Sequence, residues 1–290
     1  MKYAYYPGCS LRGTGRAYEE SLLAAFAALG IEVEELPDWN CCGATTYLSF
    51  DEPTSYALAA RNLALAQSMQ MEVIAPCAAC YLVLNKTQRY MHEYPDIKLV
   101  VTRALESIGL KCDGHVRVRH PLDVLVNDFG LKEIAAKVTK PLHGLKVAPY
   151  YGCQIVRPYA TFDDQRNPTT MDRLLEACGA KVVPYPLKTR CCGGSQKGTL
   201  PEIGLDLIRY LLTEAKKNGA EVIATVCPLC QFNLECFQAE AANGHSLIMP
   251  VLYFSQLLAF ALGAPAKAVG FDHSLVPIRP VLEKKEIAYA

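Results

Sequence analysis

The sequence has no surplus of charge of either sign. Its 290 residues contain 29 Lys and Arg against 29 Asp and Glu, which gives a formal net charge of zero at pH 7. Nucleic-acid binding depends on cationic side chains that replace phosphate counterions. A polybasic membrane anchor depends on a similar excess of positive charge. We therefore expect neither nucleic acid nor an anionic membrane surface among the partners of the chain.

Long apolar segments are also absent. No run of roughly 18 apolar residues occurs, so we expect no segment that spans a membrane. The first residues, MKYAYYPGCS, contain no apolar run of the kind found in secretory signals, so we expect a cytoplasmic location. Cysteines stay reduced in that compartment. The 13 cysteines therefore favour metal or redox chemistry over a disulfide framework.

Ten of the cysteines form two sets with almost the same spacing. The first set follows C-x31-CC-x34-C-x2-C, and the second follows C-x37-CC-x34-C-x2-C. The flanking residues repeat as well, because AYYPGC (4–9) matches PYYGC (149–153) and WNCCGAT (39–45) matches TRCCGGS (189–195). The first set is Cys9, Cys41, Cys42, Cys77 and Cys80, and the second set is Cys153, Cys191, Cys192, Cys227 and Cys230.

This repetition indicates an internal duplication. A period of roughly 145 to 150 residues is far longer than the repeat of a solenoid, so it predicts two homologous domains. A helical pattern over 131–145 ends in a turn, and we place the boundary there. The prediction is an N-terminal domain over 1–142 and a C-terminal domain over 143–290, which includes a tail from residue 263 with little periodicity.

Hydrophobic patterning predicts alternating strands and helices in each half. We expect strands at 2–7, 31–37 and 71–76 in the first half and at 145–151, 180–186 and 220–226 in the second. We expect helices at 14–30 and 52–70 in the first half and at 169–179 and 201–218 in the second, and a helix after each CxxC. This order is typical of an α/β protein with two Rossmann-like βαβ domains and mostly parallel sheets.

Each cysteine element comes directly after a predicted strand. In open parallel sheets, ligands bind beyond the carboxyl ends of the strands. We therefore expect the three strand ends in each half to bring five thiols to one place. Neither half contains a P-loop, a Ser-His-Asp order or a G-x-G-x-x-G motif, so we expect no nucleotide or flavin site within the chain.

The chemistry of five thiols leaves alternatives open. A structural zinc takes four tetrahedral ligands, so each set has one thiol too many. Iron–sulfur clusters contain several metal atoms, and adjacent cysteines can reach different atoms of such a cluster. A CxxC dithiol needs no distant CC pair. Outside the sets, we expect Cys112 and Cys178 to be core or helix-end residues. We expect Cys236 to be a packed core thiol, with an approach to the second site as the alternative.

The double C-x(31–37)-CC-G…C-x2-C pattern resembles the CCG or cysteine-rich domain. The whole chain, with its duplication and its YYPGC start, resembles the B subunit of heterodisulfide reductase. This resemblance implies an unusual non-cubane [4Fe–4S] cluster in each domain, and zinc in one half remains an alternative. It implies that Cys9, Cys41, Cys42, Cys77 and Cys80 hold the first cluster, and that Cys153, Cys191, Cys192, Cys227 and Cys230 hold the second.

The resemblance also implies a function. The chain would be a thiol–disulfide oxidoreductase that reduces or forms a disulfide of thiol cofactors by one-electron steps between two facing clusters. It implies no catalytic residue beyond the clusters. Activity would need an iron–sulfur protein similar to the C subunit of heterodisulfide reductase and a flavoprotein similar to its A subunit. The alternatives are an electron-relay component of a lactate-, succinate- or quinone-linked complex and a bacterial sulfur-carrier oxidoreductase.

Overall fold

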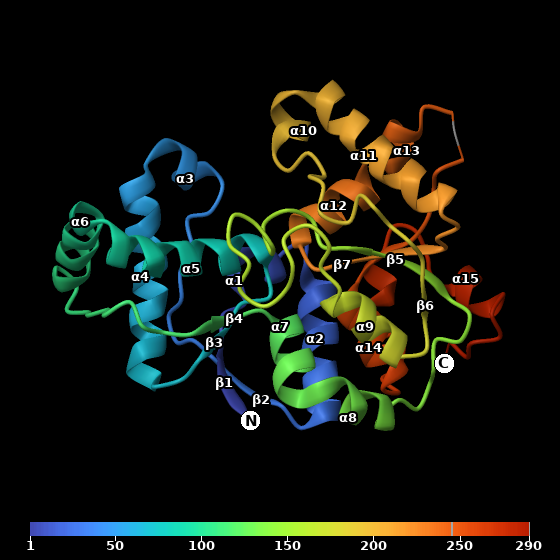
Figure 1. Cartoon of the computed structure of the whole chain (residues 1–290), viewed down its shortest axis with the longest axis horizontal. Helices are drawn as coiled ribbons and strands as arrows, with labels where there is room; N and C mark the ends of the chain where they lie inside the picture. The colour runs from blue at the N-terminus through green and yellow to red at the C-terminus, as the bar shows by residue number, and fades with distance from the viewer. Residues whose placement is uncertain (245, 290) are drawn as a thin grey trace. The chain divides into compact units, whose positions relative to one another are not determined.

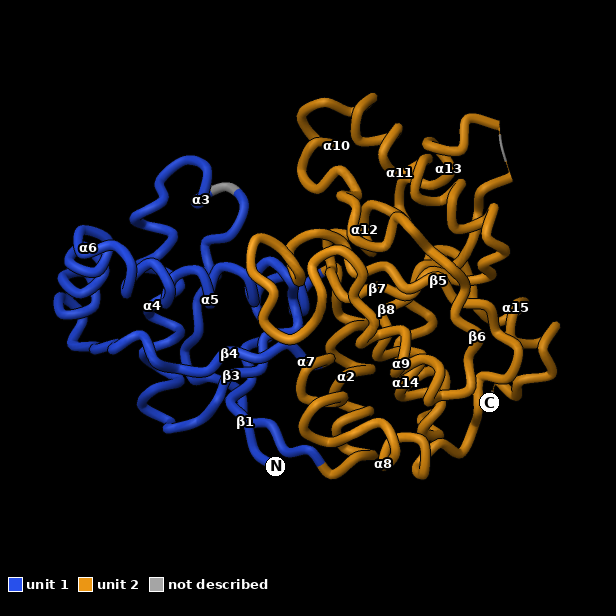
Figure 2. Tube along the Cα trace, in the orientation of Figure 1, with its two compact units in different colours: residues 1–13, 31–121 blue, residues 14–30, 122–290 orange. Residues whose placement is uncertain are grey.

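The computed structural model describes residues 1–244 and 246–289 and divides into two compact units (Figure 1, Figure 2). Unit 1 consists of Met1–Gly13 and Ile31–Pro121, and unit 2 consists of Thr14–Gly30 and Leu122–Ala290. Each unit contains a four-stranded sheet whose strands pair in parallel. The predicted α/β class with two similar parallel βαβ domains is confirmed.

The sheet of unit 1 has the order β2-β1-β3-β4. Its strands are β1 (Lys2–Tyr5), β2 (Glu32–Glu35), β3 (Val73–Ile74) and β4 (Val118–Arg119). The end of β1 pairs with the end of β2 on one side and with the end of β3 on the other. The strand order therefore reverses at β1. In open parallel sheets, this is the place where ligands bind beyond the carboxyl ends.

The helices of unit 1 pack around a core of their own. They are α1 (Gly8–Leu11), α3 (Thr46–Phe50), α4 (Glu52–Met69), α5 (Ala78–Glu93) and α6 (Pro95–Glu106). Helix α4 begins where the Asp51 carboxylate accepts the Thr54 backbone N–H at 3.2 Å, as an N-cap residue does. Helices α4, α5 and α6 contact one another through a fully buried cluster that includes Tyr56, Met91 and Val101.

Unit 2 repeats the strand order of unit 1, as β6-β5-β7-β8. Its strands are β5 (Lys146–Tyr150), β6 (Lys181–Val182), β7 (Val222–Thr225) and β8 (Val251–Tyr253). Every residue of β7 is buried, as is typical of a parallel strand covered on both faces. The strand order reverses at β5, the counterpart of β1.

Unit 2 has more helices than unit 1. They include α9 (Thr170–Ala177), α10 (Gln196–Thr199), α11 (Pro201–Lys217), α12 (Pro228–Cys236), α13 (Gln238–Ala242), α14 (Phe254–Ala261) and α15 (Arg279–Glu283). Helix α14 contacts β7, β8 and α9, while α11, α12 and α13 contact one another. The tail from residue 263 contains a 3₁₀ turn at Phe271–His273 and α15.

Two segments from the first half of the sequence belong to unit 2. These are α2 (Arg16–Leu29) and the segment after Pro121, with the π-helix η1 (Val124–Gly130) and α8 (Leu131–Ala136). Tyr18 of α2 stacks on Tyr253 with ring centroids 4.5 Å apart. The hydroxyls of Ser21 and Ser255 are hydrogen-bonded at 2.6 Å. The compact units therefore divide the chain differently from the predicted boundary at residue 142, which marks the sequence repeat.

All the predicted strands and helices are present, although β3 and β6 have only two residues each. The sequence analysis missed β4 and β8, the fourth strand of each sheet. These are short segments of two and three residues. Across the described residues, no helix is both long and apolar enough to cross a membrane.

Candidate functional site

The five motif cysteines of unit 1 lie beyond the ends of three adjacent strands. Cys9 lies in α1, just after β1, and the Cys41–Cys42 pair lies in the loop after β2. Cys77 is the N-cap residue of α5, and Cys80 lies in the first turn of that helix, after β3. The strand order therefore places Cys9 between the other two elements, at the point where the order reverses.

The structure brings all five thiols of unit 1 together in a chain of contacts. The Cys9 and Cys41 sulfurs are 4.0 Å apart, and the Cys42 and Cys80 sulfurs are 3.4 Å apart. Hydrogen bonds also join Cys41 to Cys42 and Cys77 to Cys80. In the described parts of the chain, no three Cys, His, Asp or Glu side chains surround one point as the ligands of a single ion do. The thiols instead follow one another in a row.

Unit 2 contains the same row. Hydrogen bonds join Cys153 to Cys191, Cys191 to Cys192, Cys192 to Cys230 and Cys230 to Cys227. Cys227 is the N-cap residue of α12, as Cys77 is of α5. The predicted convergence of five thiols is therefore present in both units. Their role as cluster ligands stays a prediction.

Each row has a buried end and an accessible end. The CxxC cysteines and the second cysteine of each CC pair are buried, while Cys41 and Cys191 are exposed. Cys9 is exposed and Cys153 is half-buried. A molecule that reaches the row from solvent therefore meets the first cysteine of the motif and the first cysteine of the CC pair.

In each row, one exposed cysteine has a lowered pKa, which favours its thiolate form. Hydrogen bonds from Cys42 and then Cys9 lower the pKa of Cys41. Hydrogen bonds from Cys153 and then Cys192 lower the pKa of Cys191 in the same way. The backbone N–H groups of Gly43 and Gly193 contribute in the same direction. Because the thiolate is the form that binds metals, both rows are suited to metal ligation.

A helix N-terminus assists a third thiol. A hydrogen bond from Cys80 lowers the pKa of Cys77 to about 7, and the backbone N–H groups of Cys80 and Ala79 add to this effect against the opposing effect of burial. Unpaired N–H groups in the first turn of a helix favour negative charge. The N-cap position therefore stabilises the thiolate of Cys77 at the buried end of the row.

Two glycines let the main chain approach the cysteines. Gly8 and Gly152 have φ values of +67° and +69°. A Cβ on Gly8 would lie 3.0 Å from the Cys80 sulfur, and a Cβ on Gly152 would lie 2.9 Å from the Cys230 sulfur. Since real Cβ atoms do not come this close to a sulfur without displacing it, each glycine leaves room that a side chain would take from the thiol row.

A buried tyrosine holds the CC loop in each unit. The Tyr6 hydroxyl donates to the Asn40 carbonyl at 2.8 Å, and the Tyr150 hydroxyl donates to the Arg190 carbonyl at 2.7 Å. Both acceptors belong to the residue just before the CC pair. Burial, and then the neighbouring cysteines, raise the pKa of both tyrosines, so each hydroxyl stays protonated as a donor. Sequence analysis missed this role, although both tyrosines stand three residues before the first motif cysteine.

An ion pair joins the loop before Cys191 to the first turn of α9 in unit 2. The Lys188 ammonium is 2.9 Å from Asp172, whose carboxylate also accepts the Tyr151 hydroxyl at 2.6 Å. The Lys188 carbonyl accepts the backbone N–H groups of Tyr151 and Gly152 at 2.9 and 3.0 Å. This lysine lies close to the motif in sequence, yet its charge is used inside the fold to fix the loop that precedes Cys191.

The three remaining cysteines lie outside the rows. Cys178 is fully buried at the end of α9, and Cys112 packs at the edge of the unit 1 core, in agreement with the expected core roles. The expectation for Cys236 was wrong, because this residue is exposed. It is the last residue of α12.

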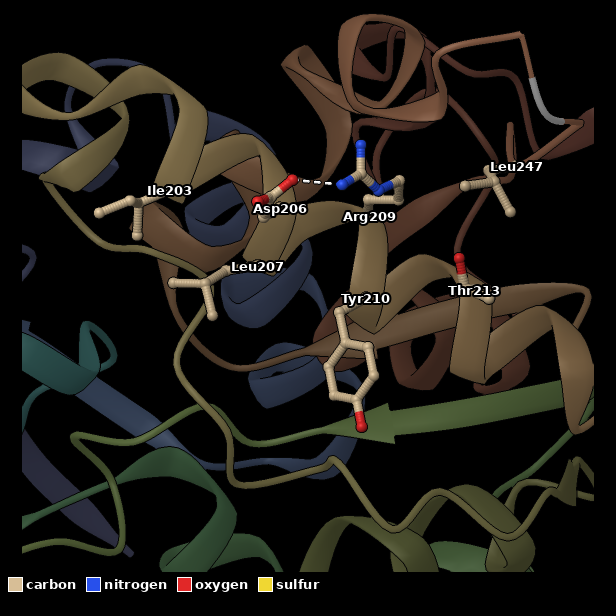
Figure 3. Close-up of a pocket in the computed structure, with 7 residues that line it drawn as sticks. All are labelled: Ile203, Asp206, Leu207, Arg209, Tyr210, Thr213 and Leu247. Atoms are coloured by element: carbon tan, nitrogen blue, oxygen red, sulfur yellow. Dashed lines mark hydrogen bonds and ion pairs between the residues drawn. The ribbon is translucent and has the colours of Figure 1, made fainter.

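One hollow on the surface lies away from the thiol rows. It runs along α11 and is lined mainly by apolar and paired charged residues, with Ile203, Leu207 and Tyr210 pointing along it and Asp206 bonded to Arg209 (Figure 3). It contains no motif cysteine. The thiol rows, and not this hollow, are therefore the candidate site.

The fold and the site define a class: a duplicated α/β protein with a complete five-thiol row at the carboxyl edge of each sheet. Residues 3–85 and 147–235 match the cysteine-rich domain family, CCG. The chain belongs to this family, and it is further related over nearly its whole length to the B subunit of heterodisulfide reductase.

Three relatives match nearly the whole chain. The 8-methylmenaquinol:fumarate reductase membrane anchor subunit of Wolinella succinogenes is 33% identical over 280 residues, which cover 95% of this chain and 97% of that protein. The B subunit of the ferredoxin:CoB-CoM heterodisulfide reductase of Methanosarcina mazei is 31% identical, with 95% and 94% covered. An Archaeoglobus profundus protein described as similar to the heterodisulfide reductase B subunit is 31% identical, with 93% and 94% covered.

A solved structure has the same fold. A hypothetical protein from Helicobacter pylori superimposes with a TM-score of 0.76 and 14% sequence identity, over 95% of this chain. This chain spans only 52% of that one. At so low an identity the likeness concerns the fold alone.

Proposed function

We propose that the chain is the catalytic iron–sulfur subunit of an oxidoreductase complex similar to heterodisulfide reductase. Each five-thiol row would hold one four-iron cluster, which is non-cubane if the family resemblance extends to the cofactor. The observation that carries this proposal is the presence of a complete row in both units, built from the same three strand ends. Family membership supports its coarser part, an iron–sulfur oxidoreductase subunit.

The donor set fits a cluster better than a single ion. Only soft thiol ligands line the row, and such ligands suit iron–sulfur clusters and zinc. Four tetrahedral ligands complete a structural zinc, which would leave one thiol of each row unused. An adjacent pair such as Cys41 and Cys42 can instead reach two metal atoms of one cluster. Zinc in one half is the outcome that would limit the proposal to a single redox site.

When bound, such clusters supply electrons one at a time. Reduction of a disulfide consumes two electrons and two protons and releases two thiols, so two one-electron centres in one chain match the requirement. The chain's own residues hold the centres in place. The buried CxxC ends anchor each row, while exposed Cys41 and Cys191 mark the side open to a substrate.

The chain would work with partner proteins. We propose an iron–sulfur protein similar to the C subunit of heterodisulfide reductase and a flavoprotein similar to its A subunit, because the sequence contains no motif for a flavin or a nucleotide. The substrate would be a small disulfide or the corresponding thiols. A cytoplasmic location remains a prediction.

A second candidate function is supported by one relative. The Wolinella succinogenes protein is named as part of a fumarate reductase that uses a methylmenaquinol, and it covers almost the whole chain. The chain would then relay electrons between a quinol and another protein of its complex, without any thiol chemistry.

An electron paramagnetic resonance (EPR) experiment separates the two functions. The full chain, purified without oxygen and carrying its clusters, is titrated with a small thiol and then with its disulfide. If the chain handles disulfides, the thiol changes the cluster signals at substoichiometric to stoichiometric amounts. If the chain is a relay, the signals are unaffected by thiol and disulfide and respond instead to a menaquinol analogue. The second result would overturn the first proposal.

A further inference from the structure

The two units contain a matched pair of positions that differ in chemistry. From the CC pair to the CxxC motif, the units are related by a constant offset of 150 residues, which aligns Cys42 with Cys192 and Cys80 with Cys230. Three residues after the last cysteine, this offset aligns Val83 of α5 with Asn233 of α12. Both side chains are buried, with exposed fractions of 1% and 2%.

The Asn233 amide is directed at the CC loop of unit 2. Its Nδ2 atom is 2.9 Å from the Gly194 carbonyl oxygen, 3.3 Å from the Cys192 carbonyl oxygen and 3.5 Å from the Cys192 sulfur. Two of these three atoms can only accept hydrogen bonds, so the NH₂ group, and not the amide oxygen, must face the loop. Asn233 therefore donates toward a sulfur of the row, and the valine in unit 1 has no donor to offer.

The backbone donors to these sulfurs are common to both units, and unit 1 has a side-chain donor of its own, the Ser10 hydroxyl, which is hydrogen-bonded to Cys9 and Cys77. The Gly194 backbone N–H is 3.5 Å from the Cys192 sulfur, and the Ala44 backbone N–H donates to Cys42 in the same way. The N-cap positions of α5 and α12 also match. The side-chain amide is thus an addition in unit 2 to a set of backbone donors that both units share.

The arginine that lies near the motif cysteines is also paired differently in the two units. In unit 1, the Arg12 guanidinium is paired with the Glu35 carboxylate. In unit 2, the Arg157 guanidinium donates to the Thr189 carbonyl and acts electrostatically on Cys191. A cation that keeps its charge unbalanced stabilises added negative charge more than a paired one does. The Asn233 amide and the Arg157 charge therefore both favour the reduced state of a cluster in unit 2.

We propose that the buried amide of Asn233 raises the midpoint potential of the cluster of unit 2. Hydrogen bonds to ligand sulfurs and nearby positive charge stabilise the reduced, more negative form of an iron–sulfur cluster and so raise its potential. The inference rests on the proposed function. It adds that a residue outside the ten motif cysteines tunes the potential of one of the two clusters.

The test is an anaerobic redox titration of the full chain followed by EPR, with iron content measured on each sample. The variants C41S and C191S, each with one row interrupted, assign the two signals to their units. Asn233→Leu, which keeps the volume and removes the donor, should lower the midpoint of the unit 2 signal relative to the parent chain and leave the unit 1 signal unchanged.

A donor introduced into unit 1 provides a second test in case the Asn233→Leu variant does not retain its cluster. Val83→Asn adds a donor in unit 1 and should raise the midpoint of the unit 1 signal, while Val83→Leu, of similar size and without a donor, should not. An unchanged unit 2 midpoint in an iron-loaded Asn233→Leu chain, or no difference between Val83→Asn and Val83→Leu, would overturn the inference while leaving two clusters in place. A chain without iron would instead overturn the proposed function.

Discussion

At the scale of single residues, Gly8 and Gly152 control how closely the main chain approaches the thiol rows. Gly8→Ala places a Cβ 3.0 Å from the Cys80 sulfur on a backbone with φ of +67°. The sulfur must move, so we expect unit 1 to lose its cluster. Iron content should fall by about half, from about eight to about four atoms per chain if both rows hold four-iron clusters.

Gly109→Ala is the matched control in the same unit. Gly109 has φ of +73°, and nothing lies within 4 Å of the Cβ that would be added. Both substitutions carry the cost of a left-handed alanine, about 1 to 2 kcal/mol, but only one displaces a motif sulfur. Equal iron content in the two variants would show that Gly8 has no special relation to the row.

Tyr6 and Tyr150 provide a second residue-scale prediction. Replacing Tyr150 by Phe removes the hydroxyl that holds the Arg190 carbonyl at 2.7 Å and leaves that part-buried acceptor without this donor. We expect a loss of about 1 kcal/mol in the free energy of unfolding, by analogy with other buried hydrogen bonds. Chemical denaturation of the parent and the variant measures the difference. Tyr6→Phe should cost less, because the Asn62 amide also donates to the Asn40 carbonyl.

The sequence predicts the roles of some of these residues and not of others. The convergence of the ten cysteines was predictable because each cysteine element follows a strand, and parallel strands end at one edge. The tyrosines were visible in the repeated YY before each first cysteine, but their acceptors are backbone carbonyls some 34 and 40 residues away. Asn233 could not be found by repetition, because its counterpart in unit 1 is a valine.

At the scale of elements, α2 is the helix whose position the sequence could not fix. The helical spacing of apolar residues over 14–30 and the glycine at position 30 predicted this helix correctly. In a βαβ unit, however, the helix after β1 is expected to cover its own sheet, whereas α2 packs on α14 in unit 2. Which element α2 packs against depends on the fit between its side chains and those of the neighbouring helix, as in the contacts of Tyr18 and Ser21. The spacing of apolar residues in the sequence does not show this fit.

Removing the Tyr18 side chain tests this packing. Tyr18 is fully buried and stacks on Tyr253 at 4.5 Å, so Tyr18→Ala should cost about 3 to 5 kcal/mol in the free energy of unfolding. Leu23→Ala, on the exposed side of α2, should change it by less than about 0.5 kcal/mol. If thermal unfolding shows similar shifts for the two variants, α2 does not contribute to the core of unit 2.

The short strands show a second limit of the sequence at this scale. β4 and β8 contribute two and three residues to their sheets, and no alternation can be detected over so short a length. What the sequence did contain was the apolar run that follows each of them, PLDVLVNDFG and FSQLLAFALG, which forms η1 and α14. These strands complete each sheet on the side away from β2 and β6.

At the scale of the whole molecule, the duplication predicts two sites that are chemically independent. Each row is complete within the residues of one unit, so an interrupted row should leave the other intact. Cys41→Ser should therefore remove or convert the first cluster and keep the EPR signal of the second. Simultaneous loss of both signals would contradict two separate sites.

The most direct test of the central claim is the iron, zinc and acid-labile sulfide content of the full chain purified without oxygen. Two four-iron clusters predict about eight iron and about eight sulfide per chain, with negligible zinc. About four iron with about one zinc would mean one redox centre and one structural site. That result would contradict disulfide chemistry at two clusters and leave the relay function in its place.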